Sequence, residues 1–316
     1  MLNNYHYFIA LAEEMNISRA AKQLYISHQC LSKYLKNLEQ QYHVTLFERT
    51  PKLRLTAAGQ AYLDMLRSVQ FLEHNLENQL NDIRQSKKGY IRLGTTEGRY
   101  RILIPDLLAK FKKIYPEVKL DVQYTTSNQL NDCILKNELD IVLLNKSDIP
   151  RNQLETRVLL DEHLSVVISD QQLEEYFPNQ YPDCKQTFAR GVNLAQFQQV
   201  PFILNYRGSN SREALEDHML RQNFRLNCIM ELSQMDMHYM MSARNYAASF
   251  CWSMYIPTIR HMNQMYHFSH LNTFPIRNLN TINQVVLATA RGKILPTYGQ
   301  DLIRLIEQQC AAFAVL

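Results

Sequence analysis

The stretch from Ser18 to Leu38 constrains the fold more strongly than any other part of the chain. Apolar residues at positions 17, 20, 21 and 24 follow the spacing of a short amphipathic helix. After a break at Tyr25, Ser27 is suited to cap a second helix, whose apolar side carries residues 31, 35, 38 and 42. Two short helices separated by so tight a turn indicate a helix-turn-helix unit.

The opposite side of the second predicted helix is polar. Its side chains are His28, Gln29, Ser32, Lys33 and Lys36. They combine donors and acceptors suited to base edges with cations suited to phosphates, as a recognition helix in a major groove requires. Ser18 and Ser27, at the starts of the two helices, join this candidate DNA-binding set. A solvated face of a small helical bundle has the same periodicity, so the flanking sequence has to decide.

The flanking sequence favours a winged domain. Residues 8–15 carry the apolar stripe of a preceding helix, and residues 44–49 and 53–55 predict two short strands around Pro51. Arg49, Lys52 and Arg54 lie on or beside this wing, where they can reach phosphates or the minor groove. Residues 1–58 are therefore predicted to form a winged helix-turn-helix.

A long helix is predicted next, because no proline occurs between Pro51 and Pro105. Residues 57–86 can form one helix of roughly 45 Å. Its apolar seam is Tyr62, Leu66, Val69, Leu72, Leu76, Leu80 and Ile83. Six steps cover 21 residues, which is the 3.5-residue period of a coiled coil. The same helix of a second copy is the favoured partner for this seam, and packing against the chain's own body is the alternative. Residues 59–89 are thus predicted to be a linker and dimerisation helix.

Strands and helices alternate from Gly89 onwards. Strands are predicted at residues 90–94, 118–124, 140–144, 164–168, 201–204, 225–232 and 283–290. Helices are predicted at residues 101–115, 129–137, 211–222 and 297–312. This alternation indicates parallel α/β construction over residues 90–316.

Parallel sheets bind ligands at the carboxyl ends of their strands, where the following helices present free amides. The polar residues that the sequence places at such positions are Thr95, Thr96, Ser127, Asn128, Arg207, Ser209 and Ser249. Each of them can instead serve as a cap or turn residue without a ligand. From the residues alone, they are candidates for an effector site.

Composition limits the function classes without choosing among them. The length of 316 residues corresponds to about two domains. The formal net charge is +4. Residues 1–89 contain 11 Lys+Arg and 8 Asp+Glu, so most of the excess positive charge lies in this N-terminal part. We expect a cytoplasmic protein without a membrane partner, because there is neither an apolar run of membrane length nor a signal-peptide pattern. No nucleophile elbow, phosphate loop or dinucleotide fingerprint occurs, so we expect neither an enzyme nor a cofactor.

Cysteines and histidines give no metal-like pattern. The six cysteines are Cys30, Cys133, Cys184, Cys228, Cys251 and Cys310, and their spacing favours reduced thiols. His261, His267 and His270 lie in a stretch rich in Asn and Gln without a paired carboxylate, which favours exposed histidines over a metal site.

Several motifs resemble the winged helix-turn-helix of LysR-type transcriptional regulators. They are Phe8-Ile-Ala-Leu-Ala-Glu-Glu14, Ser18-Arg-Ala-Ala-Lys-Gln-Leu24, Ile26-Ser27, Leu31-Ser32, Leu38-Glu39, Leu46-Phe47-Glu48-Arg49 and Leu55-Thr56-Ala-Ala-Gly59. The chain departs from the family at His28-Gln29-Cys30, which leaves the target sequence open, and at His43, where a glycine usually ends the recognition helix. His43 has to take or avoid a left-handed cap.

The resemblance extends into the second half of the chain. Leu93-Gly94, Leu103-Ile-Pro105, Tyr115-Pro116 and Leu139-Asp140 are similar to the family's effector domain. That domain has the α/β fold of type 2 periplasmic binding proteins. The resemblance implies a lobe I of about residues 90–162 and 275–316, and a lobe II of about residues 163–274. The chain would cross between the lobes near His163 and Phe274, and the candidate effector residues would meet in a hinged cleft.

The resemblance implies a transcriptional regulator that binds double-stranded promoter DNA as a homodimer or homotetramer and contacts RNA polymerase. A small-molecule effector is expected in the cleft: a carboxylate held by Thr96, Ser127 and Arg207, or an amine such as an amino acid, because Glu97 lies nearby in the sequence. A redox-sensing cysteine pair, as in some relatives, is a further alternative. Two rival classes are a winged-helix protein of another family with a non-sensing oligomerisation domain, and a solute-binding α/β protein.

Overall fold

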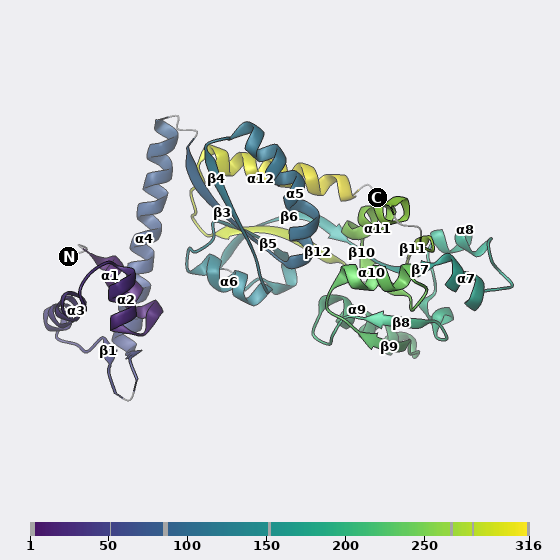
Figure 1. Ribbon diagram of the computed structural model, residues 1–316, viewed down its shortest axis with the longest axis horizontal. Helices are drawn as coiled ribbons and strands as arrows, with labels where there is room; N and C mark the ends of the chain where they lie inside the picture. The colour runs from purple at the N-terminus through teal and green to yellow at the C-terminus, as the bar shows by residue number, and fades with distance from the viewer. Residues whose placement is uncertain are drawn as a thin grey trace. The chain divides into compact units, whose positions relative to one another are not determined.

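The structure is a computed structural model that describes residues 4–50, 52–84, 88–150, 153–265, 268–279 and 281–314. It divides into two compact units. The first consists of residues 1–86 with 293–296, and the second of residues 87–292 with 297–316. Figure 1 traces both units from the purple N-terminus to the yellow C-terminus. Across the described ranges, we find no helix with the length and apolarity needed to cross a membrane.

The first unit has the predicted order of three helices, a wing and a long helix. The elements are α1 (Tyr5–Glu14), α2 (Ile17–Gln23), α3 (His28–Tyr42), β1 (Phe47–Glu48), β2 (Arg54–Leu55) and α4 (Ala57–Ile83). The two wing strands pair antiparallel, with Phe47 opposite Leu55. Phe8, Leu31 and Leu35 lie fully buried in one core that the helices and the wing share. This core fixes α3 by its apolar side and leaves its polar side free.

Side-chain caps set where the helices of this unit begin. The Asn16 side chain accepts a hydrogen bond from the Arg19 amide at the start of α2, and Ser27 accepts one from the Cys30 amide at the start of α3, both at 3.1 Å. Such caps satisfy amides that have no partner within the helix. At the other end of α3, His43 adopts φ 55°, so it takes the left-handed cap that a glycine usually provides.

The predicted seam of α4 divides into two parts. Leu66 is fully buried and Tyr62 is half-buried, and both pack in the core of the winged domain. They are core residues of their own unit, which corrects their assignment to a dimerisation seam. The physical reason is that the first turns of α4 form a wall of the winged domain. Leu72, Leu76 and Leu80 are instead 66%, 54% and 41% exposed. Val69 is half-buried, and the side chain of Ile83 lies outside the described residues.

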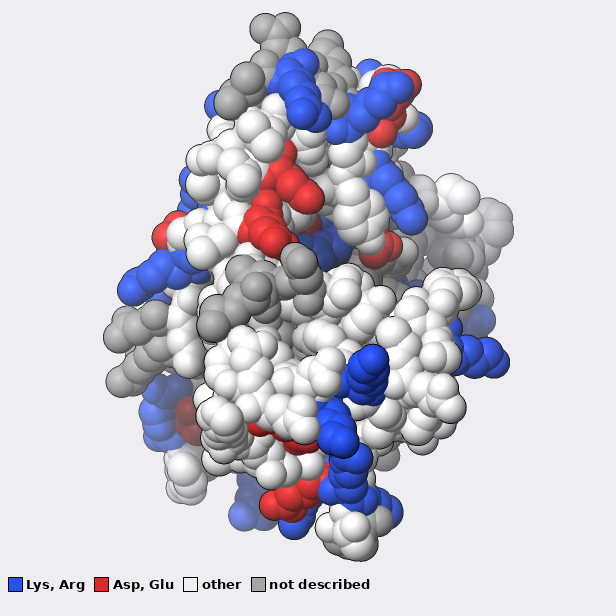
Figure 2. Space-filling view, turned by 90° about the vertical axis from the view of Figure 1, so that its left-hand side faces the viewer, with Lys and Arg blue, Asp and Glu red and all other residues white. Residues whose placement is uncertain are grey.

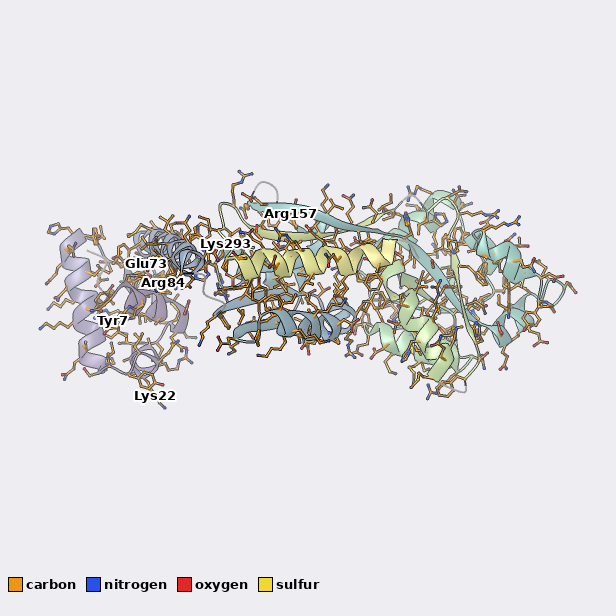
Figure 3. The ribbon with its side chains drawn as sticks, turned by 90° about the horizontal axis from the view of Figure 1, so that it is seen from above. Tyr7, Lys22, Glu73, Arg84, Arg157 and Lys293 are labelled. Carbon is orange, nitrogen blue, oxygen red and sulfur yellow. The ribbon has the colours of Figure 1, made fainter. Side chains whose placement is uncertain are left out.

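A polar face of α4 is covered within the first unit by residues 293–296. Asn75 accepts a hydrogen bond from the amide of Ile294 at 3.1 Å, and Asn78 donates one to its carbonyl at 2.9 Å. The ammonium of Lys293 lies 5.7 Å from the centre of the Phe71 ring; Figure 3 labels this lysine together with Glu73 and Arg84 of α4. This covered face carries the two asparagines, whereas the three exposed leucines stay uncovered.

The described part of the second unit contains three sheets, of five, three and two strands. The largest has the strand order β4-β3-β5-β12-β6. Its strands are β3 (Gly89–Thr95), β4 (Val118–Tyr124), β5 (Ile141–Asn145), β6 (Leu154–Glu162) and β12 (Asn283–Ala290). Strand β3 pairs parallel with β4 and β5, as predicted, and β12 runs antiparallel to β5 and β6. The accompanying helices are α5 (Glu97–Ile114), α6 (Ser127–Leu135), η1 (Lys146–Asp148) and α12 (Thr297–Ala314).

The remaining elements form a second lobe around a sheet of order β10-β7-β11 and a parallel pair, β8 and β9. Its strands are β7 (Leu164–Ser169), β8 (Pro201–Leu204), β9 (Asn227–Glu231), β10 (Ser249–Trp252) and β11 (Leu271–Pro275). Its helices are α7 (Asp170–Tyr176), α8 (Cys184–Ala189), η2 (Leu194–Phe197), α9 (Asn210–Gln222), α10 (Met235–Ala243), η3 (Ser253–Tyr255) and α11 (Ile256–Met265). Both partners of β7 run antiparallel to it.

The described chain passes between the two lobes at two places. The first passage is at His163, between β6 and β7, and the second lies between β11 and β12. Glu162 is the last residue of one crossing strand, and Asn283 is the first residue of the other. Two such connections are the covalent hinge of a two-lobed domain.

Gly59 gives a test of how closely α4 approaches the wing. A Cβ added here would collide with the backbone carbonyl of Leu46 and with the Leu55 side chain. Alanine favours a helix over glycine by about 1 kcal/mol. We nevertheless expect Gly59→Ala to destabilise the first unit by about 1–3 kcal/mol, because backbone atoms cannot move aside cheaply. Calorimetry of the full chain would measure the shift, with the exposed Gln60→Ala as the control. An unchanged transition in Gly59→Ala would contradict the close approach.

Candidate functional sites

The polar face of α3 lies open to solvent. His28, Gln29, Lys33 and Lys36 are exposed, and Ser32 is half-buried. The opposite side of the same helix is held in the core, so these side chains project together from a fixed frame. Ser18 is also exposed, in the first turn of α2, and the Ser27 hydroxyl is engaged as the cap of α3.

The wing is tied to α3 through one carboxylate. An oxygen of Glu39 accepts hydrogen bonds from the amides of Leu46 and Phe47, at 2.8 and 3.2 Å. Its other oxygen lies 3.7 Å from Arg49. Arg54 pairs with Glu48 across the wing. The Arg54–Glu48 pair is exposed, and such pairs contribute little stability, so Arg54 can exchange its carboxylate for a phosphate at low cost. Lys52 is exposed on the same wing.

Tyr25 was not part of the predicted DNA-binding set. It lies in the turn between α2 and α3, with φ 55° and a side chain that is 97% exposed. The sequence signal that could have drawn attention to Tyr25 is a large aromatic side chain in the break between the two predicted helices. Viewed from the side on which Figure 1 draws the N-terminus, the surface shows lysine and arginine scattered among neutral and acidic side chains (Figure 2).

The second unit has a cavity of about 460 Å³ that residues of both lobes line. Four of the seven predicted effector residues line it, and they are Thr96, Ser127, Arg207 and Ser209. Thr96 directly precedes α5, Ser127 begins α6, and Ser209 caps α9 by accepting a hydrogen bond from the Arg212 amide. The structure thus brings together polar groups from three helix starts, as the parallel-sheet argument predicts.

Three predicted effector residues do not line the cavity. Thr95 is fully buried at the end of β3, because the alternation of the strand points its side chain into the core. Asn128 is exposed on α6, outside the cavity. Ser249 is fully buried, and its hydroxyl is 2.9 Å from that of Ser242. These three assignments are wrong as cavity-lining positions.

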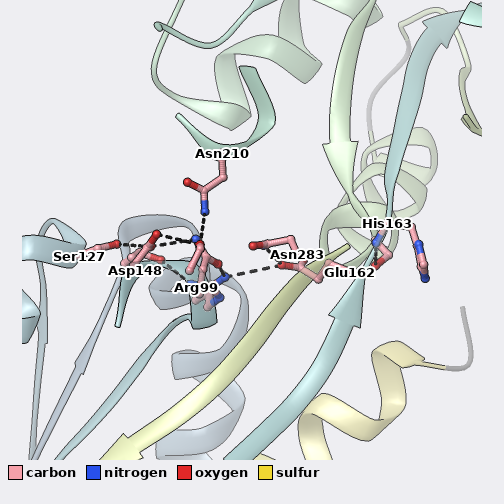
Figure 4. Close-up of polar contacts among 11 residues, drawn as sticks. Arg99, Ser127, Asp148, Glu162, His163, Asn210 and Asn283 are labelled. Atoms are coloured by element: carbon pink, nitrogen blue, oxygen red, sulfur yellow. Dashed lines mark hydrogen bonds and ion pairs between the residues drawn. The ribbon is translucent and has the colours of Figure 1, made fainter. Parts of the chain in front are cut away.

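A buried ion pair lies at this cavity and was missed by the sequence analysis. Arg99 Nη2 lies 3.6 Å from Glu162 Oε2, and the two side chains are only 8% and 2% exposed. Asn283 donates a hydrogen bond of 3.0 Å to the same carboxylate, and Arg99 contacts Asn145 and Thr96. Burial raises the pKa of Glu162, and both Arg99 and the Asn283 hydrogen bond act against this shift. Figure 4 shows Arg99 between Glu162 on one side and Asp148 on the other.

Asp148 is the second carboxylate at the cavity. It accepts hydrogen bonds from Ser127 Oγ at 2.7 Å and from Asn145 Nδ2 at 3.1 Å. Its neighbour Ser147 accepts one of 3.5 Å from Asn210, in the first turn of α9, so this contact joins the two lobes (Figure 4). Both carboxylates at the cavity, those of Asp148 and Glu162, are therefore held in defined positions by hydrogen bonds.

Glu97 does not line this cavity, although its position in the sequence suggested a role there. It pairs with Arg101 at 2.8 Å and lines a separate cavity of about 200 Å³. The negative charge at the larger cavity comes from Asp148 and Glu162 instead. The sequence position of Glu97 suggested an acidic side chain at the site, but the carboxylates that line the cavity are those of Asp148 and Glu162.

The cysteines and histidines form no other site in the described part of the chain. All six cysteines are free thiols, and Cys184, Cys251 and Cys310 are buried. No group of three or more His, Cys, Asp or Glu among the described residues is placed to hold a metal ion. His267 lies outside the described residues.

A winged helix-turn-helix and a two-lobed α/β unit in one chain define a transcriptional regulator. The sequence matches the family described as "Bacterial regulatory helix-turn-helix protein, lysR family" over residues 2–60. It matches the family described as "LysR substrate binding domain" over residues 84–311. The chain belongs to the LysR family of transcriptional regulators.

Named relatives agree with this assignment. The transcriptional activator CmpR of Synechocystis sp. is 28% identical over 235 residues, which are 73% of this chain and 72% of CmpR. The transcriptional regulator CysL of Bacillus subtilis is 27% identical over 219 residues, 68% of each chain. All of these relatives are regulators and not enzymes.

Solved structures share the fold over the whole length. Full-length OxyR from Pseudomonas aeruginosa has a TM-score of 0.62 at 17% identity, over 96% of this chain and 95% of its own. CbnR, solved with its target DNA, has a TM-score of 0.55 at 18% identity, over 96% of this chain and 97% of its own. At such identities the likeness establishes the fold alone.

The Arg99–Glu162 pair gives a second test. We expect Arg99→Met to destabilise the second unit by about 3–5 kcal/mol, because a buried carboxylate is left without its partner. Adding Glu162→Gln should recover most of this loss. In the single variant the loss should grow as the pH rises above 4.5, the ordinary pKa of a glutamic acid, since a carboxyl whose pKa is raised in the folded state costs stability as it ionises.

Urea unfolding followed by the emission of Trp252 measures these changes, because this single tryptophan of the chain lies in the second unit. Equal losses in the single and the double variant would contradict the pairing.

Proposed function

We propose that this regulator binds double-stranded promoter DNA through α3 and the wing. The observation that carries the proposal is the exposed polar face of α3, fixed by a serine cap at its start and by the buried leucines behind it. His28, Gln29 and Ser32 are suited to base edges, whereas Lys33 and Lys36 are suited to phosphates. The solved complex of CbnR with its target DNA supports the same use of a related fold.

We propose further that two copies pair through α4. Leu72, Leu76 and Leu80 support this, because they form an exposed apolar row on a long helix. Burying such a row against a second copy removes apolar surface from water. A two-fold pair also presents two recognition helices to dyad-related half-sites in DNA. The protein would then act as a homodimer or as a homotetramer of two such pairs.

The cavity between the lobes is proposed to bind a small-molecule effector. Polar side chains from both lobes line it, and the chain crosses between the lobes at only two places. A ligand that binds one lobe arrangement more tightly shifts the population toward it by the difference in affinity. Through that shift an effector can change how the paired subunits engage DNA.

DNA binding is tested by substitutions on the two kinds of contact. Lys33→Ala and Lys36→Ala should each weaken binding to every duplex and lower the salt slope of log Kd by about 1, because each removes a phosphate contact. Gln29→Ala should instead change the preference between sequences by about 1–3 kcal/mol. Fluorescence anisotropy across a salt series measures both, with Lys110→Ala on α5 as the charge-matched control. Unchanged binding in all three α3 variants would overturn the assignment.

Pairing through α4 is tested by charge in the exposed row. The double variant Leu72→Glu/Leu76→Glu should be a monomer, because four carboxylates cannot share an apolar interface. Gln79→Glu, on an exposed position of the same helix, should keep the wild-type mass. Sedimentation equilibrium of the full chain distinguishes these states. The same mass for wild type and double variant would contradict the proposal.

A further inference from the structure

The charges around the larger cavity are balanced. Arg99 and Arg207 are the cations that line it, and Asp148 and Glu162 are the carboxylates. Arg99 and Glu162 come from lobe I, next to one crossing strand, and Arg207 comes from lobe II, just before α9. A binding site with two charges of each sign has no preference for a ligand of one sign.

The buried pair does not use all of its hydrogen-bonding capacity. Arg99 Nε and Glu162 Oε1 have no hydrogen-bond partner, although both residues are more than nine-tenths buried. A buried donor or acceptor that lacks a hydrogen-bond partner costs free energy, because it has given up its hydrogen bonds to water. The floor of the cavity therefore keeps one donor and one acceptor without a hydrogen bond. A polar group of a ligand, or a small shift of the pair, can supply the missing hydrogen bonds.

A ligand of one sign fits this arrangement poorly. An anion would bring its charge close to Asp148 and Glu162, and a cation would bring its charge close to Arg99 and Arg207. Like charges that approach within a few ångströms in a partly desolvated site repel strongly. A molecule that carries one ammonium and one carboxylate a few ångströms apart meets both sets of charges with opposite sign.

The lobe II side of the cavity provides the position for a carboxylate. Helix α9 is 13 residues long, and its first residues, Ser209, Asn210 and Ser211, line the cavity. Amides at a helix start attract a negative group. Arg207 lies just ahead of them and is 81% exposed, with Glu216 at 3.7 Å. The lobe I side offers Asp148, held by Ser127 and Asn145, as the position for an ammonium group (Figure 4).

One part of the remaining wall of the cavity is largely apolar. It is formed by Met235, Trp252, Met254 and Tyr255. Such a wall accommodates a hydrocarbon or thioether side chain beside the two charged groups. We propose that the effector is a free α-amino acid, with its carboxylate at the start of α9 and Arg207 and its ammonium at Asp148. This inference rests on the proposed role of the cavity as the effector site.

Trp252 makes the test direct, because the only tryptophan of the chain lines the cavity. The full-length protein is titrated with each of the 20 common L-amino acids while Trp252 emission is recorded. Each amino acid that changes the emission is then compared with its N-acetyl derivative and its methyl ester. We expect at least one free amino acid to bind, and both derivatives to bind at least tenfold more weakly, since each has lost one charge.

Substitutions locate the binding within the cavity. Asp148→Asn should weaken the binding of that amino acid by about tenfold or more, because it removes the charge opposite the ammonium. Asp132→Asn is the control, since Asp132 is exposed on the neighbouring helix α6 and does not line the cavity. Equal weakening in both variants would overturn the placement of the ammonium.

Succinate and putrescine, as a dianion and a dication, complete the set of probes. If either of them changes the Trp252 emission and no amino acid does, the amino-acid inference fails while the cavity keeps its effector role. If no probe changes the emission, the amino-acid inference also fails. Neither result touches the DNA-binding proposal, which the α3 variants test separately.

Discussion

The second unit depends on the ion pair between Arg99 and Glu162. Two charged side chains that are buried have to pair with each other and form further hydrogen bonds. Otherwise the loss of their hydration lowers the stability of the folded state by several kcal/mol. Thr96, Asn145 and Asn283 supply such bonds here. Together with Arg99 and Glu162 themselves, they come from the start of α5 and from the ends of β5, β6 and β12. The pair therefore fixes the positions of four chain segments that meet where the lobes join.

The first unit depends on a different constraint, an apolar core. Leu31 and Leu35 of α3 and Leu66 of α4 are fully buried in the same cluster. Because the beginning of α4 completes the winged domain, α4 has a rigid origin, and its exposed leucines begin only at Leu72. The same helix thus stabilises the winged domain at one end and exposes an apolar row of leucines at the other.

Local signals of the sequence were enough to predict the first unit. Ser27 caps α3 as its position before an apolar stripe predicts. The sequence left open whether His43 takes or avoids the left-handed conformation, and the structure shows that it takes it. Thr96 and Ser127 were found because helix starts after parallel strands follow a general rule. Arg99 was missed because the predicted helix began two residues later, at Arg101. Glu162 and Asn283 were missed because they are far apart in the sequence, and only the pairing of β6 with β12 brings them together.

The Arg99–Glu162 pair holds together β6 and β12, the two strands at which the chain crosses between the lobes. Hydrogen–deuterium exchange of the full chain tests this most directly, by comparing wild type with Glu162→Gln at the backbone amides of residues 160–164 and 283–286. We expect faster exchange in both segments of the variant, by a similar factor, because the Glu162 carboxylate belongs to the first segment and accepts a hydrogen bond from Asn283 in the second. Faster exchange in residues 160–164 alone, with residues 283–286 unchanged, would contradict it.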